Sequence, residues 1–231
     1  MSDWIPVSFD LLPAVASVSG ILRFHLLETS PHLRLYATPV NMDPQKPALP
    51  ISTPPRYARD LAEHLGNFYT QGLPEEPAAL SAGALDDSSF LAQADHIYEE
   101  RLRLLEFELG RFRAGLLFAY FGGVDQVSHM MWRARDPNHT AYNAVTDSPN
   151  ASVVDELYRG LDAIVSDTLA TLGPDDLLVV MSDHGFTSWR RAFHLNSWLR
   201  DHGYLTLVDP NRRDDPGFFG KELITAGVGT S

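Results

Sequence analysis

The chain has 231 residues, of which 44% are hydrophobic and 21% charged, a composition typical of a folded globular protein rather than a disordered one. Its 30 acidic and 18 basic residues give a net charge of -12, which disfavours binding to nucleic-acid polymers because that binding depends on basic residues. The sequence contains no cysteine, which excludes disulfides and thiol nucleophiles, and no run of about 18 apolar residues that would predict a membrane span.

Three regions with different patterns follow one another along the chain. Residues 1–41 contain short alternating or apolar runs broken by Pro and Ser, which predicts a small antiparallel β region. Residues 42–86 are rich in Pro and Gly and predict a long connection or lid with one helix over residues 57–69. From residue 87 to residue 231 the pattern is that of an α/β core.

Within the third region, helices and strands are predicted to alternate. A helix over residues 89–112 leads to an apolar run at 116–121, and a second helix begins at Val153, where apolar residues recur at helical spacing. A second apolar run follows at 176–182. Strands that are buried on both faces of a parallel sheet show such continuous apolar runs, so the two runs predict parallel strands joined by a crossover helix. A short helix and an edge strand are predicted after them, over residues 194–207.

Both apolar runs end in an Asp and a His. Asp125 and His129 follow the first run, and Asp183 and His184 follow the second. In open α/β sheets the ligand-binding crevice lies beyond the carboxyl ends of the strands, so the four side chains are expected to meet there. Carboxylate and imidazole together suit zinc, manganese or iron, whereas magnesium and calcium prefer oxygen ligands. The pattern therefore predicts a site for two divalent metal ions, with zinc as the first choice and manganese or iron as alternatives.

The spacing within each Asp and His pair determines which backbone conformation would let the two side chains bind one ion. Asp125 and His129 are four residues apart, so one helical turn places both side chains on the same face. Asp183 and His184 are adjacent, so the backbone must turn before they can share an ion, and Gly185 would permit this turn. Two ions about 3.5–4 Å apart would clamp the attacking and leaving oxygens of a phosphoryl group.

The segments GVDQVSHMMW, SDHGF and RRAFHLNSWLRDHGYL, together with PVNMDPQKPALPISTPP, resemble the type I phosphodiesterase and nucleotide pyrophosphatase family of the alkaline phosphatase superfamily. The resemblance implies a partial alkaline-phosphatase-like three-layer sandwich with parallel strands, preceded by the small antiparallel sheet. It also implies that Asp125 and His129 bind one metal ion and that Asp183 and His184 bind the other. Residues 87–231 would then be the metal-binding part of a catalytic domain.

The chain also departs from the pattern of this family. Family members carry a further metal-binding Asp and a Thr or Ser nucleophile upstream of the Asp125 motif, and a third metal-binding His downstream of Asp183. No candidate for the nucleophile or the upstream Asp is found, and the opening MSDWIPVSFDLLP resembles the middle of a longer protein. We therefore expect an internal fragment that is inactive in isolation.

Three functions are compatible with the sequence. The first is a metal-dependent hydrolase of phosphoric esters of the phosphodiesterase or nucleotide pyrophosphatase type, acting on a small anionic phosphoester. The second is a related phosphomonoesterase, phosphonatase or sulfatase. The third is a non-catalytic α/β module that binds metal or a partner. The sequence does not determine the substrate, the oligomeric state or the localisation.

Overall fold

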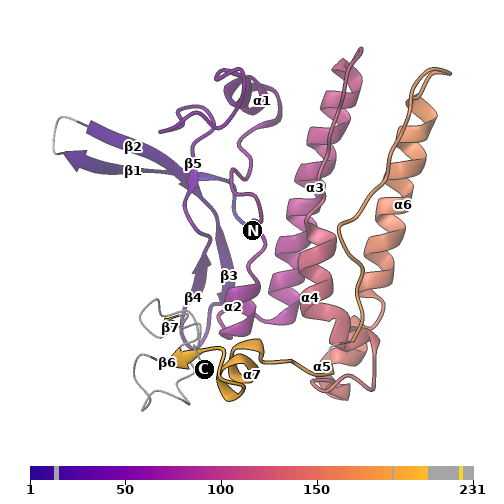
Figure 1. Cartoon of the computed structure of the whole chain (residues 1–231). Coiled ribbons are helices and arrows are strands. Elements are labelled where there is room, and N and C mark those ends of the chain that lie inside the picture. The colour runs from indigo at the N-terminus through magenta and orange to yellow at the C-terminus, as the bar shows by residue number, and fades with distance from the viewer. Residues whose placement is uncertain (13–15, 189, 208–223, 226–231) are drawn as a thin grey trace. The chain divides into compact units, whose positions relative to one another are not determined.

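The computed structural model describes residues 1–12, 16–188, 190–207 and 224–225 (Figure 1). The chain divides into two compact units, Met1–Ser188 and Trp189–Ser231, and each is described by itself. In the described residues, no helix is both long enough and apolar enough to cross a membrane.

The first unit begins with short strands and continues with helices (Figure 1). Its strands are β1 (Ile5–Leu12), β2 (Ala16–Leu22), β3 (Phe24–Glu28), β4 (Arg34–Ala37) and β5 (Asn41–Met42). Its helices are α1 (Tyr57–Leu65), α2 (Pro77–Ser81), α3 (Asp87–Arg111), α4 (Gly123–Arg135), α5 (Ala144–Asp147), the 3-10 turn η1 (Ser148–Asn150) and α6 (Val153–Thr171).

The strands form two small antiparallel sheets, in the order β1-β2-β5 and β3-β4, as the sequence predicts for this region. Gly20 lies opposite Val7 in the first sheet. A Cβ atom on Gly20 would lie 2.5 Å from Val40 Cγ1, so a side chain at this position would displace the neighbouring strand connection. Glycine at this position thus avoids a clash with the Val40 side chain.

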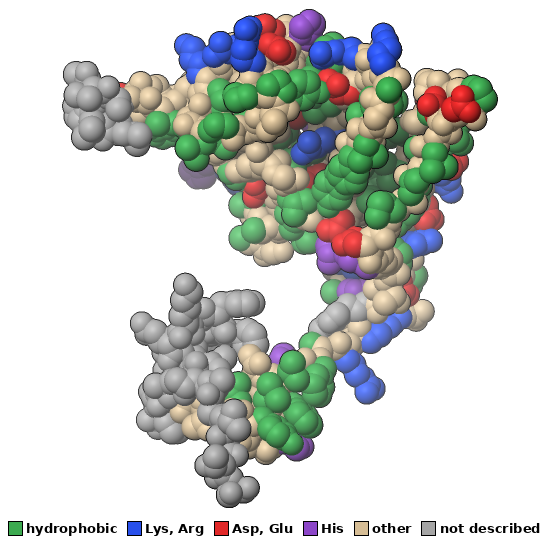
Figure 2. All heavy atoms as spheres, turned by 45° about the horizontal axis from the view of Figure 1, so that its top comes forward, with side chains coloured by type: hydrophobic (Ala, Val, Ile, Leu, Met, Phe, Trp, Pro, Cys, Tyr) green, Lys and Arg blue, Asp and Glu red, His purple; other side chains and the backbone are tan. Residues whose placement is uncertain are grey.

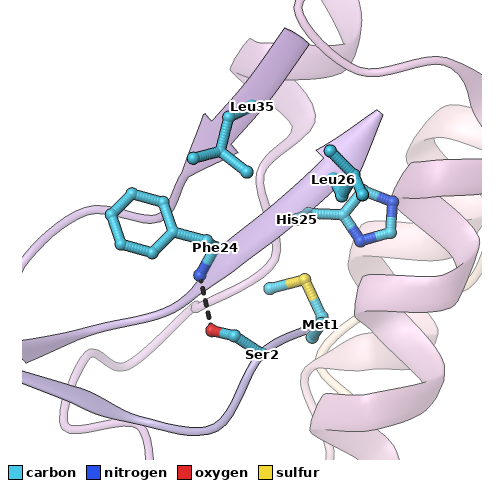
Figure 3. A pocket seen from close by; sticks show the side chains of 6 residues that line it. All are labelled: Met1, Ser2, Phe24, His25, Leu26 and Leu35. Carbon is cyan, nitrogen blue, oxygen red and sulfur yellow. Dashed lines mark hydrogen bonds between the residues drawn. The ribbon is translucent and has the colours of Figure 1, made fainter. Parts of the chain in front are cut away.

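The N-terminal segment is held against β3. Ser2 N donates to Phe24 O at 2.8 Å, and Phe24 N donates to Ser2 Oγ at 2.9 Å. Figure 3 shows the side chains of Phe24 and His25 on opposite sides of β3, as the strand period of two requires. Together with Met1, Leu26 and Leu35, these residues line a cavity of about 350 Å³.

The core of the first unit lies among α3, α4 and α6. Its buried members share an apolar character and come from all three helices: Phe90, Ala94, Val127, Met131 and Val154. The helix α3 begins at a clear cap, because the Asp86 side chain accepts a hydrogen bond from Ser89 N at 2.7 Å. Its observed range agrees with the predicted helix over residues 89–112, and α6 begins at the predicted Val153.

An ion-pair network fixes α4 in this layer. Arg133 Nε donates to the fully buried Asp147 at 2.9 Å, and Arg133 Nη2 lies 2.5 Å from Asp87 at the start of α3. Asn143 N donates to the second oxygen of Asp147 at 2.8 Å. Burial lowers the pKa of Arg133, but the hydrogen bonds and charges of Asp87 and Asp147 outweigh burial and raise it overall. Arg133 therefore stays charged and joins three elements.

The two apolar runs differ from their predicted structure. Residues 116–121 and 176–182 run in the same direction in Figure 1, between α3 and α4 and after α6, but neither is a strand. Every strand pair in the described residues is antiparallel, and no backbone hydrogen bond is formed by 116–121 or 177–181. The described residues do not show the predicted parallel strands at these segments, because a strand forms only beside a second strand and the neighbouring elements are helices.

In the second unit, the described residues contain α7 (Leu195–Asp201) and the antiparallel pair β6 (Thr206–Leu207) and β7 (Ile224–Thr225). The short helix and the following strand agree with the sequence prediction. Trp198 stacks on His202 at a ring distance of 4.2 Å and on Tyr204 at 6.0 Å. These rings connect α7 to the residues that follow it.

Candidate metal centre

The first Asp and His pair lies at the start of α4. Asp125 is in the first turn of the helix and His129 one turn later. The His129 Nε2 atom lies 3.4 Å from Asp125 Oδ1, which is the contact that spacing by four residues allows. Gln126 Nε2 donates to the other oxygen, Asp125 Oδ2, at 2.9 Å. Asp125 Oδ2 is thus hydrogen-bonded to its helix neighbour Gln126, and Oδ1 faces the His129 imidazole.

The second pair lies in the extended segment after α6. The backbone bends at Asp183, and His184 N donates to Asp183 Oδ1 at 3.1 Å. Ser182 Oγ donates to His184 O at 2.6 Å, which holds the bend. Gly185 is not among the described glycines with a left-handed backbone, so the turn does not depend on it as the sequence suggested. The Asp183 side chain is 88% exposed, and it can therefore reorient toward a ligand.

The two pairs come together around Asp125. His184 Nε2 lies 3.7 Å from Asp125 Oδ1 and 3.6 Å from Asp183 Oδ2, so one imidazole nitrogen bridges the two carboxylates. Asp125 Oδ1 is inaccessible to water and has no hydrogen-bond partner among the described residues. A buried carboxylate oxygen without a partner is costly, and two imidazole nitrogens already face it.

Phe186 joins the two histidines, a contact that the sequence did not single out. Its ring centre lies 5.0 Å from His129 and 5.5 Å from His184, in edge-to-face geometry with both. It also stacks on Trp132 of α4 at 5.6 Å. The signal in the sequence was an aromatic residue directly after the SDHG turn, where a polar loop residue is the usual choice.

Glu75 is a second residue that sequence reasoning missed. It is 4% exposed, and its Oε2 atom has no hydrogen-bond partner within the described part of the chain. Its other oxygen lies so close to the start of α4 that a Cβ atom on Gly123 would be 3.1 Å away. Burial raises the pKa of Glu75, and the charge of Asp125 raises it further. A buried carboxyl group thus faces the helix turn that carries Asp125.

The donor atoms suit a metal ion, but the four residues alone do not form a complete site. Two carboxylates and two imidazoles are the ligand types that zinc, manganese and iron accept. Among the described residues, however, no group of three or more His, Asp or Glu side chains is arranged closely enough to hold an ion. The structure brings Asp125, His129, Asp183 and His184 together without showing that they bind metal.

Comparison with known proteins identifies the family. The family model described as type I phosphodiesterase / nucleotide pyrophosphatase matches residues 31–225, which include α4 and the Asp183 turn. No curated protein and no solved structure matches the chain. The family is one of hydrolases that act on phosphoesters, and it is alkaline-phosphatase-like in fold. Since the match covers most of the sequence, the chain belongs to the type I phosphodiesterase / nucleotide pyrophosphatase family.

Proposed function

We propose that the chain carries the metal-binding part of a metal-dependent hydrolase of phosphoric esters. The observation that carries the proposal is the convergence of His129 Nε2 and His184 Nε2 on the partnerless Asp125 Oδ1, at 3.4 and 3.7 Å. The two histidines come from segments far apart in the sequence, and both meet the one oxygen of Asp125 that accepts no hydrogen bond from the described residues. Membership of the hydrolase family supports the same assignment.

In this proposal each pair holds one ion. Asp125 and His129 would hold the first and Asp183 and His184 the second, with zinc as the favoured metal and manganese or iron as alternatives. Bound ions of this kind polarise the phosphoryl group and stabilise the charge of the attacking and leaving oxygens. The role of Gln126 is to orient Asp125, because it holds Oδ2 and leaves Oδ1 for the ion.

The substrate proposed is a small anionic phosphoester. The net charge of -12 repels anions at long range, so the chain by itself attracts such a substrate only where local positive charge is supplied. We also propose that residues 116–121 and 176–182 occupy strand positions of the alkaline-phosphatase-like sandwich when further strands are beside them. Their apolar side chains are of the kind that a doubly covered strand buries.

Metal titration tests the proposal directly. In isothermal titration calorimetry with zinc or manganese, the chain is expected to bind weakly, because each pair supplies two ligands whereas catalytic zinc sites use three. Asp125→Asn is expected to weaken binding at least about tenfold, since losing even an outer-sphere partner of a metal ligand costs that much. His32→Gln is the matched control, because His32 is exposed in a loop outside the site.

Hydrolysis of bis-p-nitrophenyl phosphate provides the second readout. The 231-residue chain is expected to show no metal-dependent turnover, because no Thr or Ser nucleophile was found in it and residues that act as a unit fail as a unit. A product encoded by any upstream extension of the reading frame is expected to be active, and Asp183→Asn or His129→Ala is expected to abolish that activity. Equal metal affinity of Asp125→Asn and the unchanged chain would contradict the proposed site.

A second candidate function is a non-catalytic metal-binding or interaction module. It stays an alternative because the sequence offers no candidate for a Thr or Ser nucleophile. Inactivity of the extended product toward phosphate, phosphonate and sulfate esters, with metal binding retained, would select this alternative. Hydrolysis of a sulfate or phosphonate ester in place of a phosphodiester would instead select one of the related enzymes.

A further inference from the structure

A cleft of about 370 Å³ lies in the first unit. Its lining comes from α1, from the loop at residues 68–72, from the middle of α3 and from the apolar segment before α4. This volume falls at the small end of the range for ligand pockets, about 300–1,000 Å³. A ligand of one ring and one polar group matches it in size.

Aromatic rings form much of the wall. Tyr57, Phe68, Tyr69 and Tyr120 line the cleft, with Leu61 of α1 beneath them. Tyr69 is 3% exposed, and burial raises the pKa of Tyr57 to about 12, assisted by a hydrogen bond and the charge of Glu108. Tyrosines of this kind stay neutral and offer flat apolar faces, which prefer a planar ring as a neighbour.

Three polar groups in the cleft make no hydrogen bond with the described residues. They are the Arg101 guanidinium of α3, whose charge acts on the carboxyl groups of Glu75 and Glu100, the Gln71 side-chain amide and the Tyr120 hydroxyl. Glu100, the neighbour of Arg101, accepts from Tyr69 N at 2.7 Å and lies 3.8 Å from Arg23, so it is engaged elsewhere. The Arg101 guanidinium offers a planar fork of donors that matches carboxylate and phosphate oxygens.

The floor of the cleft is held in place by one buried amide. Asn41 is 1% exposed, and its Oδ1 accepts hydrogen bonds from Thr70 N at 2.9 Å and Gln71 N at 3.2 Å. Thr70 Oγ1 donates to Met42 O at 3.1 Å. The backbone that carries Gln71 is therefore fixed before any ligand arrives, which reduces the entropy lost on binding.

We propose that this cleft binds a planar aromatic ring that carries an oxyanion group. The rings of Phe68 and Tyr120 contact the face of the ligand, and Arg101 pairs with its phosphate or carboxylate. Gln71 supplies a further donor to the oxyanion. The proposal rests on the cleft alone and is independent of metal binding at Asp125.

Calorimetry with phenyl phosphate in the presence of EDTA tests this inference, because EDTA removes any contribution of metal ions. The 231-residue chain is expected to bind one phenyl phosphate saturably, and inorganic phosphate at least about tenfold more weakly, since the ring contacts are lost. Arg101→Gln is expected to weaken phenyl phosphate binding by at least about tenfold. Arg103→Gln is the matched control, because Arg103 is exposed on the same helix and does not line the cleft.

Two further measurements complete the test. Benzoate in place of phenyl phosphate distinguishes the two sources of the oxyanion, and tight binding of either supports the cleft. Phe68→Leu is expected to weaken the aromatic ligands and to leave inorganic phosphate unchanged. Equal binding of phenyl phosphate by Arg101→Gln and by the unchanged chain, with both folded by circular dichroism, would overturn the proposal, as would inorganic phosphate binding as tightly as phenyl phosphate.

Discussion

The helical layer and the two extended segments both carry apolar residues but differ in burial. Phe90 and Met131 in the helical layer are fully buried. Leu116 and Leu177 in the extended segments are 90% and 84% exposed, and Figure 2 shows hydrophobic side chains in continuous exposed runs on one face of the molecule. A helix satisfies its own backbone hydrogen bonds, whereas an extended segment needs a neighbour. Apolar sequence is therefore sufficient for a helix to pack and insufficient for a strand.

The helical layer and the extended segments can be compared by substitution, and the largest loss of stability is expected at Phe90. Phe90→Ala removes a fully buried ring from the contact of α3 with α4, and we expect it to lower the free energy of unfolding by about 3–5 kcal/mol. Urea denaturation followed by circular dichroism measures the change.

The matched variant in the extended segment is Leu177→Ala. Since Leu177 is 84% exposed, its truncation is expected to change stability by less than about 0.5 kcal/mol. A loss of 2 kcal/mol or more at Leu177 would show that the extended segments are packed in solution, and the contrast between the two regions would then be broken.

A smaller effect is expected at Asp147, which anchors α4 through Arg133. Asp147→Ala removes a buried carboxylate that accepts from Arg133 Nε and Asn143 N, and leaves the guanidinium with Asp87. We expect a loss of about 2–3 kcal/mol, because Arg133 Nε and Asn143 N both lose their hydrogen-bond acceptor. Denaturation of Asp147→Ala at 1 M salt provides the check: the loss should persist, whereas a surface pair would be screened.

A smaller effect than that at Asp147 concerns Glu75, at the point where the first extended segment meets α4. Burial raises the pKa of Glu75 above its usual value of 4.5, so its contribution to stability is present below pH 4.5 and is lost as pH rises through the raised pKa. Glu75→Gln has no carboxyl group at this position, so the variant does not lose this stability as the pH rises. We expect the variant to be more stable than the unchanged chain at pH 8, by about 1 kcal/mol, and no more stable at pH 4. If the free energy of unfolding depends on pH in the same way in both proteins, the raised pKa of Glu75 is contradicted.

The helices were predictable from the sequence because their determinants are local. Apolar spacing placed α3 and α6, and the Asp86 cap and Val153 lie at their observed starts. The extended segments were not predictable by the same means. Their Val and Leu content favours strands, but strand formation depends on pairing between distant segments, which periodicity does not report.

The candidate site was predictable in part for the same reason. Spacing by four residues on a helix brings Asp125 and His129 together, and the structure shows this contact. The contact of His184 with Asp125 follows from the path of the chain through α5 and α6, and the sequence anticipated it through a crossover between strands that the described residues do not form. Glu75 was missed because it lies in the connection, where a carboxylate is ordinarily exposed.

The ring of Phe186 has a consequence for how quickly an ion can be captured. It contacts both His129 and His184 and stacks on Trp132, so it adds apolar contacts to those that both imidazoles make with Asp125. If the proposed ions bind here, they would meet two imidazoles already held close together, and capture would be limited by encounter and loss of hydration water more than by rearrangement of the histidines.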